Sequence, residues 1–121
     1  MLVRDFECRS YGQAIKLLGG RDSRAVCNNT VLREGESGRF VAVELYGHEI
    51  VALWSDGVAI LSSFGHRTNT TKDRINRCLP GGWRVSSVKG GWRLSNRWQE
   101  LSGMPFVDGM TVPGTDTGGE R

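Results

Sequence analysis

The chain has 121 residues, of which 38% are hydrophobic and 24% are charged, and it contains 17 glycines but three prolines. This composition excludes a disordered chain, and the length suits about one compact domain. The chain has no apolar run of the roughly 18 residues that span a bilayer, and the charged residues near its start do not fit a signal peptide. We therefore expect a cytoplasmic, turn-rich β protein without a membrane partner.

The first expected element is a short amphipathic helix over residues 11–18. Ser10 and Gln13 have the capping-box spacing, in which the serine hydroxyl and the glutamine side chain satisfy unpaired backbone N–H groups. Tyr11, Ile15 and Leu18 then recur at helical spacing, and a pair of glycines ends the segment.

Residues 25–32 are expected to form one strand, and residues 39–63 have the pattern of a three-stranded antiparallel meander. Apolar residues in the meander first alternate with other residues and then form a continuous run. Asp56-Gly57 follows that run and predicts a hairpin turn of type I′, in which both central residues have positive φ.

A second helix is expected over residues 71–79. Thr70 and Asp73 repeat the capping-box spacing, and Pro80 ends the segment. Its apolar residues form a buried side, and we expect Asp73 to pair with Arg77 one turn later. The cationic side chains of this helix are expected to face outward; they are Lys72, Arg74 and Arg77.

A short repeat predicts a second hairpin near the C-terminal end. The pattern Gly-Gly-Trp-Arg-x-Ser occurs at residues 81–86 and again at 90–95, a spacing that suits two strands turning near Lys89-Gly90. A two-residue turn would place the apolar side chains on one face: Trp83, Val85, Trp92 and Leu94. The opposite face would be basic and polar: Arg84, Ser86, Arg93 and Ser95. Core packing is the simpler role for the tryptophans, and stacking on a ligand is the alternative.

Together these elements predict an α+β domain over residues 1–101. Its antiparallel sheet would have about five or six strands, made of the meander and the C-terminal hairpin, and would carry two short helices. Residues 102–121 are rich in glycine and are expected to pass from a loosely docked segment into a disordered tail.

The three cysteines, Cys8, Cys27 and Cys78, are expected to be buried thiols. Their number is odd and no C-x-x-C motif occurs, so the sequence suggests neither a disulfide framework nor a zinc site. We also find no nucleophile elbow and no phosphate-binding glycine motif, and the two histidines, His48 and His66, lack a metal-ligand spacing. The sequence therefore predicts no catalytic residue, metal or cofactor, and we expect a protein that is not an enzyme.

Basic residues cluster in one segment. Eight of the 16 Lys and Arg residues lie between residues 66 and 97, where Asp73 is the single acidic residue. Such clustering is typical of proteins that bind an anionic partner, although a solvated charged face has the same composition. The candidate nucleic-acid-binding residues are Lys72, Arg74, Arg77, Arg84, Arg93 and Arg97, with Trp83, Trp92 and Trp98 as candidate stacking residues.

The alternative is a module that binds or inhibits another protein. Its contact would be the small apolar group Met104, Phe106 and Val107 in the segment after residue 101. The sequence does not specify an oligomeric state.

Residues 28–95 resemble a family of small proteins of actinobacterial phages and prophages. The resemblance rests on the pattern TTK-x-RIN at residues 70–76, Leu-Pro at 79–80, Gly-Trp-x-Val at 82–85 and Gly-Trp at 91–92. It implies a phage-type α+β domain that acts in a bacterial cytoplasm, and it implies no particular activity. The two ends of the chain do not share the pattern.

Overall fold

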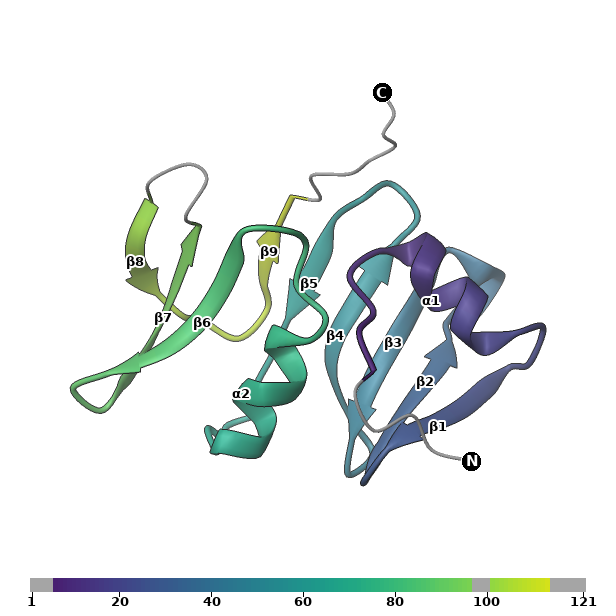
Figure 1. Cartoon of the computed structure of the whole chain (residues 1–121), viewed down its shortest axis with the longest axis horizontal. Helices are drawn as coiled ribbons and strands as arrows, with labels where there is room; N and C mark the ends of the chain where they lie inside the picture. Colours follow the sequence, from purple (N-terminus) through teal and green to yellow (C-terminus); the bar gives the residue numbers. More distant parts are fainter. Residues whose placement is uncertain (1–5, 97–100, 114–121) are drawn as a thin grey trace.

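The computed structural model describes residues 6–96 and 101–113 and confirms the expected α+β class (Figure 1). Within these residues the helices are α1 (Tyr11–Leu18), α2 (Asn69–Asn76) and a 3-10 turn over Glu36–Gly38. The strands are β1 (Ser23–Cys27), β2 (Thr30–Glu34), β3 (Phe40–Leu45), β4 (His48–Trp54), β5 (Ala59–Leu61), β6 (Trp83–Val88), β7 (Gly91–Asn96), β8 (Leu101–Pro105) and β9 (Met110–Val112).

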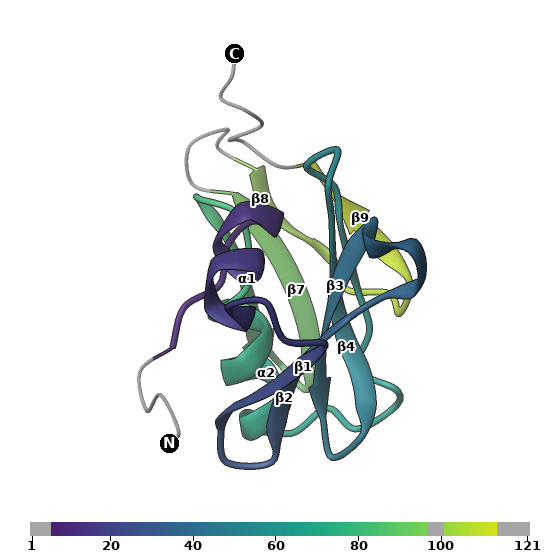
Figure 2. The ribbon, with the colours of Figure 1, turned by 90° about the vertical axis from the view of Figure 1, so that its right-hand side faces the viewer.

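These strands form two antiparallel sheets rather than the single sheet that we expected. The larger sheet has the order β1-β2-β3-β4-β5-β9, and the smaller has the order β6-β7-β8. Both α-helices lie on the same side of the larger sheet, as Figure 2 shows, and the smaller sheet lies next to α2. The core fills the space between the helices and the sheets, and its large buried side chains include Leu32, Ile50, Leu61, Ile75, Val85 and Leu94.

Helix α1 begins and ends where the sequence predicts. The Gln13 backbone N–H donates to the Ser10 hydroxyl at 3.1 Å, and the Gln13 side chain accepts from the Arg9 N–H at 2.7 Å. Gly19 follows the helix with φ 60°, and its N–H donates to the Ile15 carbonyl. Local capping chemistry is therefore sufficient to define this helix.

Helix α2 begins two residues earlier than predicted, because Thr68 rather than Thr70 caps it. The Thr68 backbone is extended, and its hydroxyl accepts a hydrogen bond from the Thr71 N–H at 3.1 Å. The helix ends at Asn76 instead of 79, although Cys78 still packs in the core. Thr71 is buried, and its burial requires the helix to begin after Thr68. Burial of Thr71 therefore selects Thr68 over Thr70 as the cap.

Residues 25–32 form two strands instead of one. β1 and β2 make a hairpin that turns at Asn28-Asn29, where Asn29 has φ 56°. Asparagine tolerates the left-handed region better than most residues, which makes this turn possible without glycine.

The predicted meander is present as β3, β4 and β5, but the turn at Asp56-Gly57 differs from the predicted type. In the β4–β5 connection, residues 55–58, φ is positive at Gly57 and not at Asp56, so the turn is not of type I′. The tight turn with two positive φ values instead joins β3 to β4 at Tyr46-Gly47.

The segment after residue 101, which we expected to be loosely docked, contributes two strands and part of the core. β8 extends the smaller sheet, and β9 pairs with β5 at the edge of the larger sheet. Phe106 and Val112 are buried. The Asp108 carboxylate accepts hydrogen bonds at 2.8 Å from both the N–H and the hydroxyl of Ser63. The disordered tail was expected over residues 113–121, of which residues 114–121 lie outside the described residues.

All three cysteines are free and buried, as predicted. Burial raises the pKa of the Cys8 thiol to about 12, and it raises the pKa of the Cys78 thiol well above its ordinary value. Because the thiolate is the reactive form, we expect labelling of the native protein by Ellman's reagent at pH 8 to be slow at every cysteine. Labelling should become fast in denaturant, and one thiol that reacts at once in the native protein would contradict this prediction.

Candidate functional site

The hairpin of β6 and β7 has the predicted even register. Val88 pairs with Gly91, so the turn consists of Lys89 and Gly90, which have φ 49° and 83°. The face toward the core carries Val85, Trp92 and Leu94, all of which are buried. The alternation of side chains therefore leaves the arginines of the hairpin on its outer face.

The outer face of the hairpin is defined here by Arg84, Ser86, Arg93 and Ser95. Arg84 lies opposite Ser95 and Arg93 lies opposite Ser86 across the two strands, and both arginines are exposed. The Arg93 side chain also donates to the Gly103 carbonyl of β8 at 3.2 Å. Residues 83–96 contain no acidic residue, so this face is positively charged.

Asn76, the last residue of α2, holds the hairpin in place. Its side-chain amide donates to the Val85 carbonyl at 2.9 Å and accepts from the Val85 N–H at 2.8 Å. These two bonds satisfy the backbone N–H and carbonyl of Val85 on the outer edge of β6. They also fix the distance between α2 and the hairpin.

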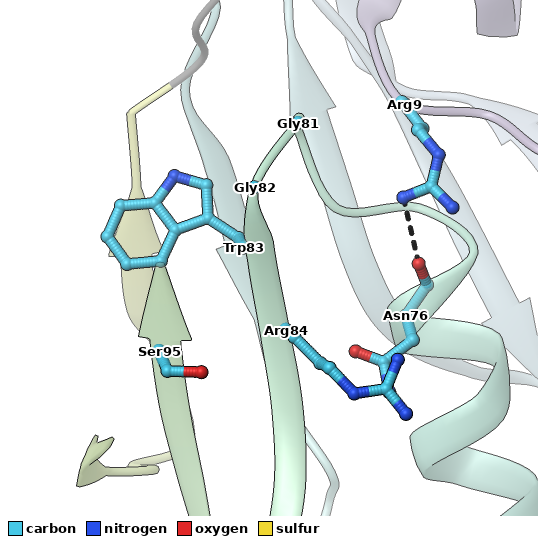
Figure 3. A pocket seen from close by; sticks show the side chains of 7 residues that line it. All are labelled: Arg9, Asn76, Gly81, Gly82, Trp83, Arg84 and Ser95. Atoms are coloured by element: carbon cyan, nitrogen blue, oxygen red, sulfur yellow. Dashed lines mark hydrogen bonds between the residues drawn. The ribbon is translucent and has the colours of Figure 1, made fainter. Parts of the chain in front are cut away.

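A cavity of about 390 Å³ lies where the start of β6 meets the end of α2 (Figure 3). Figure 3 shows the Arg84 side chain on the same side of β6 as Asn76, with the Trp83 ring on the other side of the strand. The cavity is lined by Arg9, Asn76, Gly81, Gly82, Trp83, Arg84 and Ser95.

Three lining residues have different roles in this cavity. Arg9 donates to the carbonyls of Asn76 and Leu79 at 3.0 and 2.9 Å, so it satisfies the end of α2 and is only partly available to a ligand. Trp83 is half-buried, and its indole nitrogen is buried without a hydrogen-bond partner among the described residues. Arg84 is the exposed cation at the cavity.

The helix cations do not join this face, which corrects the expectation that Lys72, Arg74 and Arg77 face outward. The Arg74 side chain is 14% exposed; it pairs with Asp73 at 2.5 Å and donates to the Thr30 hydroxyl at 2.9 Å. Arg77 forms the predicted pair with Asp73 at 2.9 Å, and its guanidinium lies over the Phe6 ring at 5.8 Å. Both arginines therefore connect α2 to other parts of the fold.

Lys72 is also directed away from the outer face. Its ammonium group donates to the Ser87 hydroxyl at 2.8 Å, and Ser87 pairs with Trp92 on the opposite side of the hairpin. The candidate basic residues Arg84 and Arg93 thus remain together, whereas Arg97 lies outside the described residues.

Trp92 is a core residue and not an exposed stacking surface. It is 6% exposed and meets the Phe106 ring edge-on, with 5.3 Å between ring centroids. The Arg67 guanidinium covers both rings at 5.6 and 5.2 Å. Of the three candidate stacking residues, Trp83 lines the cavity and Trp98 lies outside the described residues.

The apolar group proposed as a protein contact is divided by the fold. Phe106 is buried in the core, while Met104 and Val107 are exposed on either side of it in sequence. Only these two of the three residues are accessible to a partner.

Sequence reasoning missed Arg9 and Lys89 as neighbours of the basic face. Arg9 reaches the cavity by bonding to carbonyls about 70 positions later, for which local sequence has no signal. Lys89 lies at the exposed tip of the hairpin. Because it belongs to the turn, the alternation of side chains along the strands does not assign it to either face.

None of the helices in the described residues is long and apolar enough to cross a membrane.

Comparison with known proteins agrees with a phage origin. Comparison with curated proteins and with solved structures gives no match. A family model described as the Kyanoviridae Gp96 protein matches residues 11–113, which is most of the chain and more than the segment on which the sequence resemblance rested. The chain therefore belongs to the Kyanoviridae Gp96 family of phage proteins.

Proposed function

We propose that this phage protein binds single-stranded nucleic acid through the outer face of the β6–β7 hairpin. The observation that supports this proposal is the exposed pair of Arg84 and Arg93 on a face without acidic residues. Guanidinium groups suit phosphate oxygens because they donate two parallel hydrogen bonds. Ser86 and Ser95, which pair with these arginines across the strands, are small and polar, so the sugar-phosphate backbone of a nucleic acid can approach the strands closely.

The cavity at Trp83 extends this face. Arg84 and Trp83 both line this cavity, so a phosphate bonded to Arg84 brings the attached sugar or base to a place where the Trp83 ring offers stacking area. Stacking on an aromatic ring and pairing of phosphate with cations are the two elements of binding that tolerates many sequences. We see in this face no element that enters a groove, so the proposed binding does not depend on base sequence.

The double substitution Arg84→Glu with Arg93→Glu tests this proposal. We expect it to abolish binding to a fluorescent single-stranded oligonucleotide, because two attractive charges become repulsive. The free energy of unfolding should change by less than about 1 kcal/mol, since both side chains are exposed. In fluorescence anisotropy at several salt concentrations, the slope of log K against log salt should fall by about one for each lost phosphate contact.

The matched control is Arg21→Glu with Arg39→Glu, which makes the same change in net charge at exposed positions outside the hairpin. The control should bind more weakly by a small factor only, through the long-range field of the protein. Equal loss in both double mutants would show that net charge alone causes binding, and unchanged binding in the hairpin mutant would refute the proposed face.

A contact with a host bacterial protein is the second candidate function. It is favoured by the exposure of Met104 and of Val107, the latter 58% exposed, at the edge strand and the following loop. Capture from a bacterial lysate with and without nuclease distinguishes the two functions. Partners that survive nuclease and are lost with Met104→Asp and Val107→Asp support the protein contact.

We further propose that the protein acts by binding rather than catalysis, in the cytoplasm of an infected bacterium. The three free thiols suit a reducing compartment, and nucleic acid is accessible there. The narrower relation to phages of actinobacteria rests on the TTK-x-RIN pattern of α2 and on the Gly-Trp pairs of the hairpin.

A further inference from the structure

A second cavity, of about 220 Å³, lies between the β3–β4 turn and the start of α2. It is lined by Leu45, Tyr46, His48, Ile50, Ser63, His66, Thr68 and Thr71. None of these residues is Lys, Arg, Asp or Glu, so the part of a ligand that enters the cavity is uncharged. The volume suits a single small ring system rather than a large cofactor.

Aromatic rings form one wall of this cavity and continue onto the surface beside it. The His48 and His66 rings are stacked, with centroids 5.6 Å apart and planes inclined by 28°. Phe64 adds a third ring, 5.2 Å from His48 at 30°. A ligand that stacks on an aromatic ring must itself be flat, so this group of rings favours a flat ligand.

The backbone is strained where it displays two of the rings. Tyr46 and Phe64 have φ 53° and 52°, a region that bulky residues rarely adopt. Their side chains are nevertheless 67% and 48% exposed, so core burial does not offset the strain. Tight turns such as Tyr46-Gly47 favour asparagine or glycine at the first position, and a tyrosine there has no structural advantage. Strain of this kind is typical of functional sites.

The rings also offer polar atoms that the fold leaves unused. Within residues 6–96 and 101–113, no protein group hydrogen-bonds to the imidazole nitrogens of His48 and His66 or to the Tyr46 hydroxyl, and all three side chains are exposed. By contrast, the Thr68 hydroxyl caps α2 and the Ser63 hydroxyl bonds to Asp108. A ligand with both a flat face and a hydrogen-bonding edge would use what the rings provide, whereas an aliphatic side chain would use neither.

We propose that this cavity binds a nucleobase, supplied either by a single strand or by a free nucleoside. The base enters beside Tyr46 and stacks on the Tyr46 ring, and its polar edge bonds to the imidazole nitrogens of His48 and His66. The sugar and phosphate stay outside, since the lining contains no lysine or arginine. The cavity is separate from the hairpin face, so this inference stands on its own observations and not on the proposed function.

The test uses the two histidines as reporters, because the chain contains only these two. The full-length protein is titrated with adenosine, cytidine and a short single-stranded oligonucleotide while NMR follows the ring protons of both histidines. We expect saturable ring-current shifts with the nucleosides. Tighter binding of the oligonucleotide identifies a strand as the source of the base, and equal binding identifies a free nucleoside. Inorganic phosphate alone should cause no such shifts.

Tyr46→Asn removes the ring and creates an Asn-Gly turn that suits the backbone. It should leave the melting temperature unchanged or raise it, and it should weaken nucleoside binding by roughly 5- to 150-fold, the range for the loss of one stacked ring. Lys89→Asn is the matched control, because it makes the same Asn-Gly pair at the hairpin tip, where φ is also positive. It should gain stability and keep nucleoside binding. Phe64→Gly provides a second ring deletion at a positive φ.

Three results would overturn the inference. They are an absence of shifts at both histidines with every nucleoside, wild-type affinity in both ring deletions, and tighter binding of N-acetyl-leucinamide than of the nucleosides. The Arg84→Glu and Arg93→Glu double mutant separates this site from the proposed function, since it should keep its affinity for uncharged nucleosides even when it no longer binds the oligonucleotide.

Discussion

Replacing Trp92 by alanine should lower the free energy of unfolding by about 3–5 kcal/mol, as expected for the loss of a large buried aromatic side chain. Trp92 packs against Phe106 and beneath Arg67, so it joins β7 to the loops before α2 and after β8. Its removal leaves a cavity between three segments that are far apart in sequence. Urea denaturation followed by circular dichroism measures the loss.

Trp83→Ala is the informative comparison. Trp83 is half-buried and lines the cavity, so its removal should cost less stability than that of Trp92 and should weaken oligonucleotide binding in the folded protein. The two tryptophans occupy the same position in the repeated Gly-Gly-Trp-Arg pattern. Equal destabilisation by both substitutions would contradict their assignment to different environments.

The second large effect is expected for Asn76→Ala, which should cost about 2–4 kcal/mol because it leaves the N–H and the carbonyl of Val85 without their partner. The substitution should separate the edge of β6 from α2 before the rest of the domain unfolds. Native-state hydrogen exchange at the Val85 amide is the direct measurement, and exchange there should become much faster than in the core of the larger sheet.

Asn69→Ala is the control for this prediction, since Asn69 is exposed in the first turn of the same helix. It should change stability by less than about 0.5 kcal/mol. Asn76→Asp provides a second variant of nearly equal size: a carboxylate accepts from the Val85 N–H but cannot donate to its carbonyl. Wild-type protection of the Val85 amide in Asn76→Ala would show that the amide pairing does not hold the hairpin.

Features that depend on neighbouring residues were predictable from the sequence. The ends of α1 follow from Ser10 and Gly19, and the register of the β6–β7 hairpin follows from Lys89-Gly90. In each case a few consecutive side chains or φ values determine the geometry. Neighbouring residues were not enough to predict the start of α2, because both Thr68 and Thr70 precede the helix as possible caps. Burial of Thr71 selects Thr68.

Features that depend on distant contacts were not predictable. Arg74 and Arg77 look like solvated cations in sequence, and their partners Thr30 and Phe6 lie more than 40 positions away. Alternation along the strands was therefore enough to place the hairpin arginines on one face, whereas the positions of the helix cations could not be predicted. The aromatic residues around His48 and His66 had no periodic pattern, because two loops and a strand bring them together.

The pairing of β5 with β9 has a consequence for how the chain is synthesised. All of β6, β7 and β8 lies between these two neighbouring strands, so the larger sheet cannot be completed until residues 110–112 have been made. At roughly 5–20 residues per second, a ribosome needs about 3–10 s to proceed from β5 to β9. During that interval β5 presents an unpaired apolar edge to other nascent chains. The yield of correctly folded protein should therefore depend on the speed of translation between residues 62 and 110.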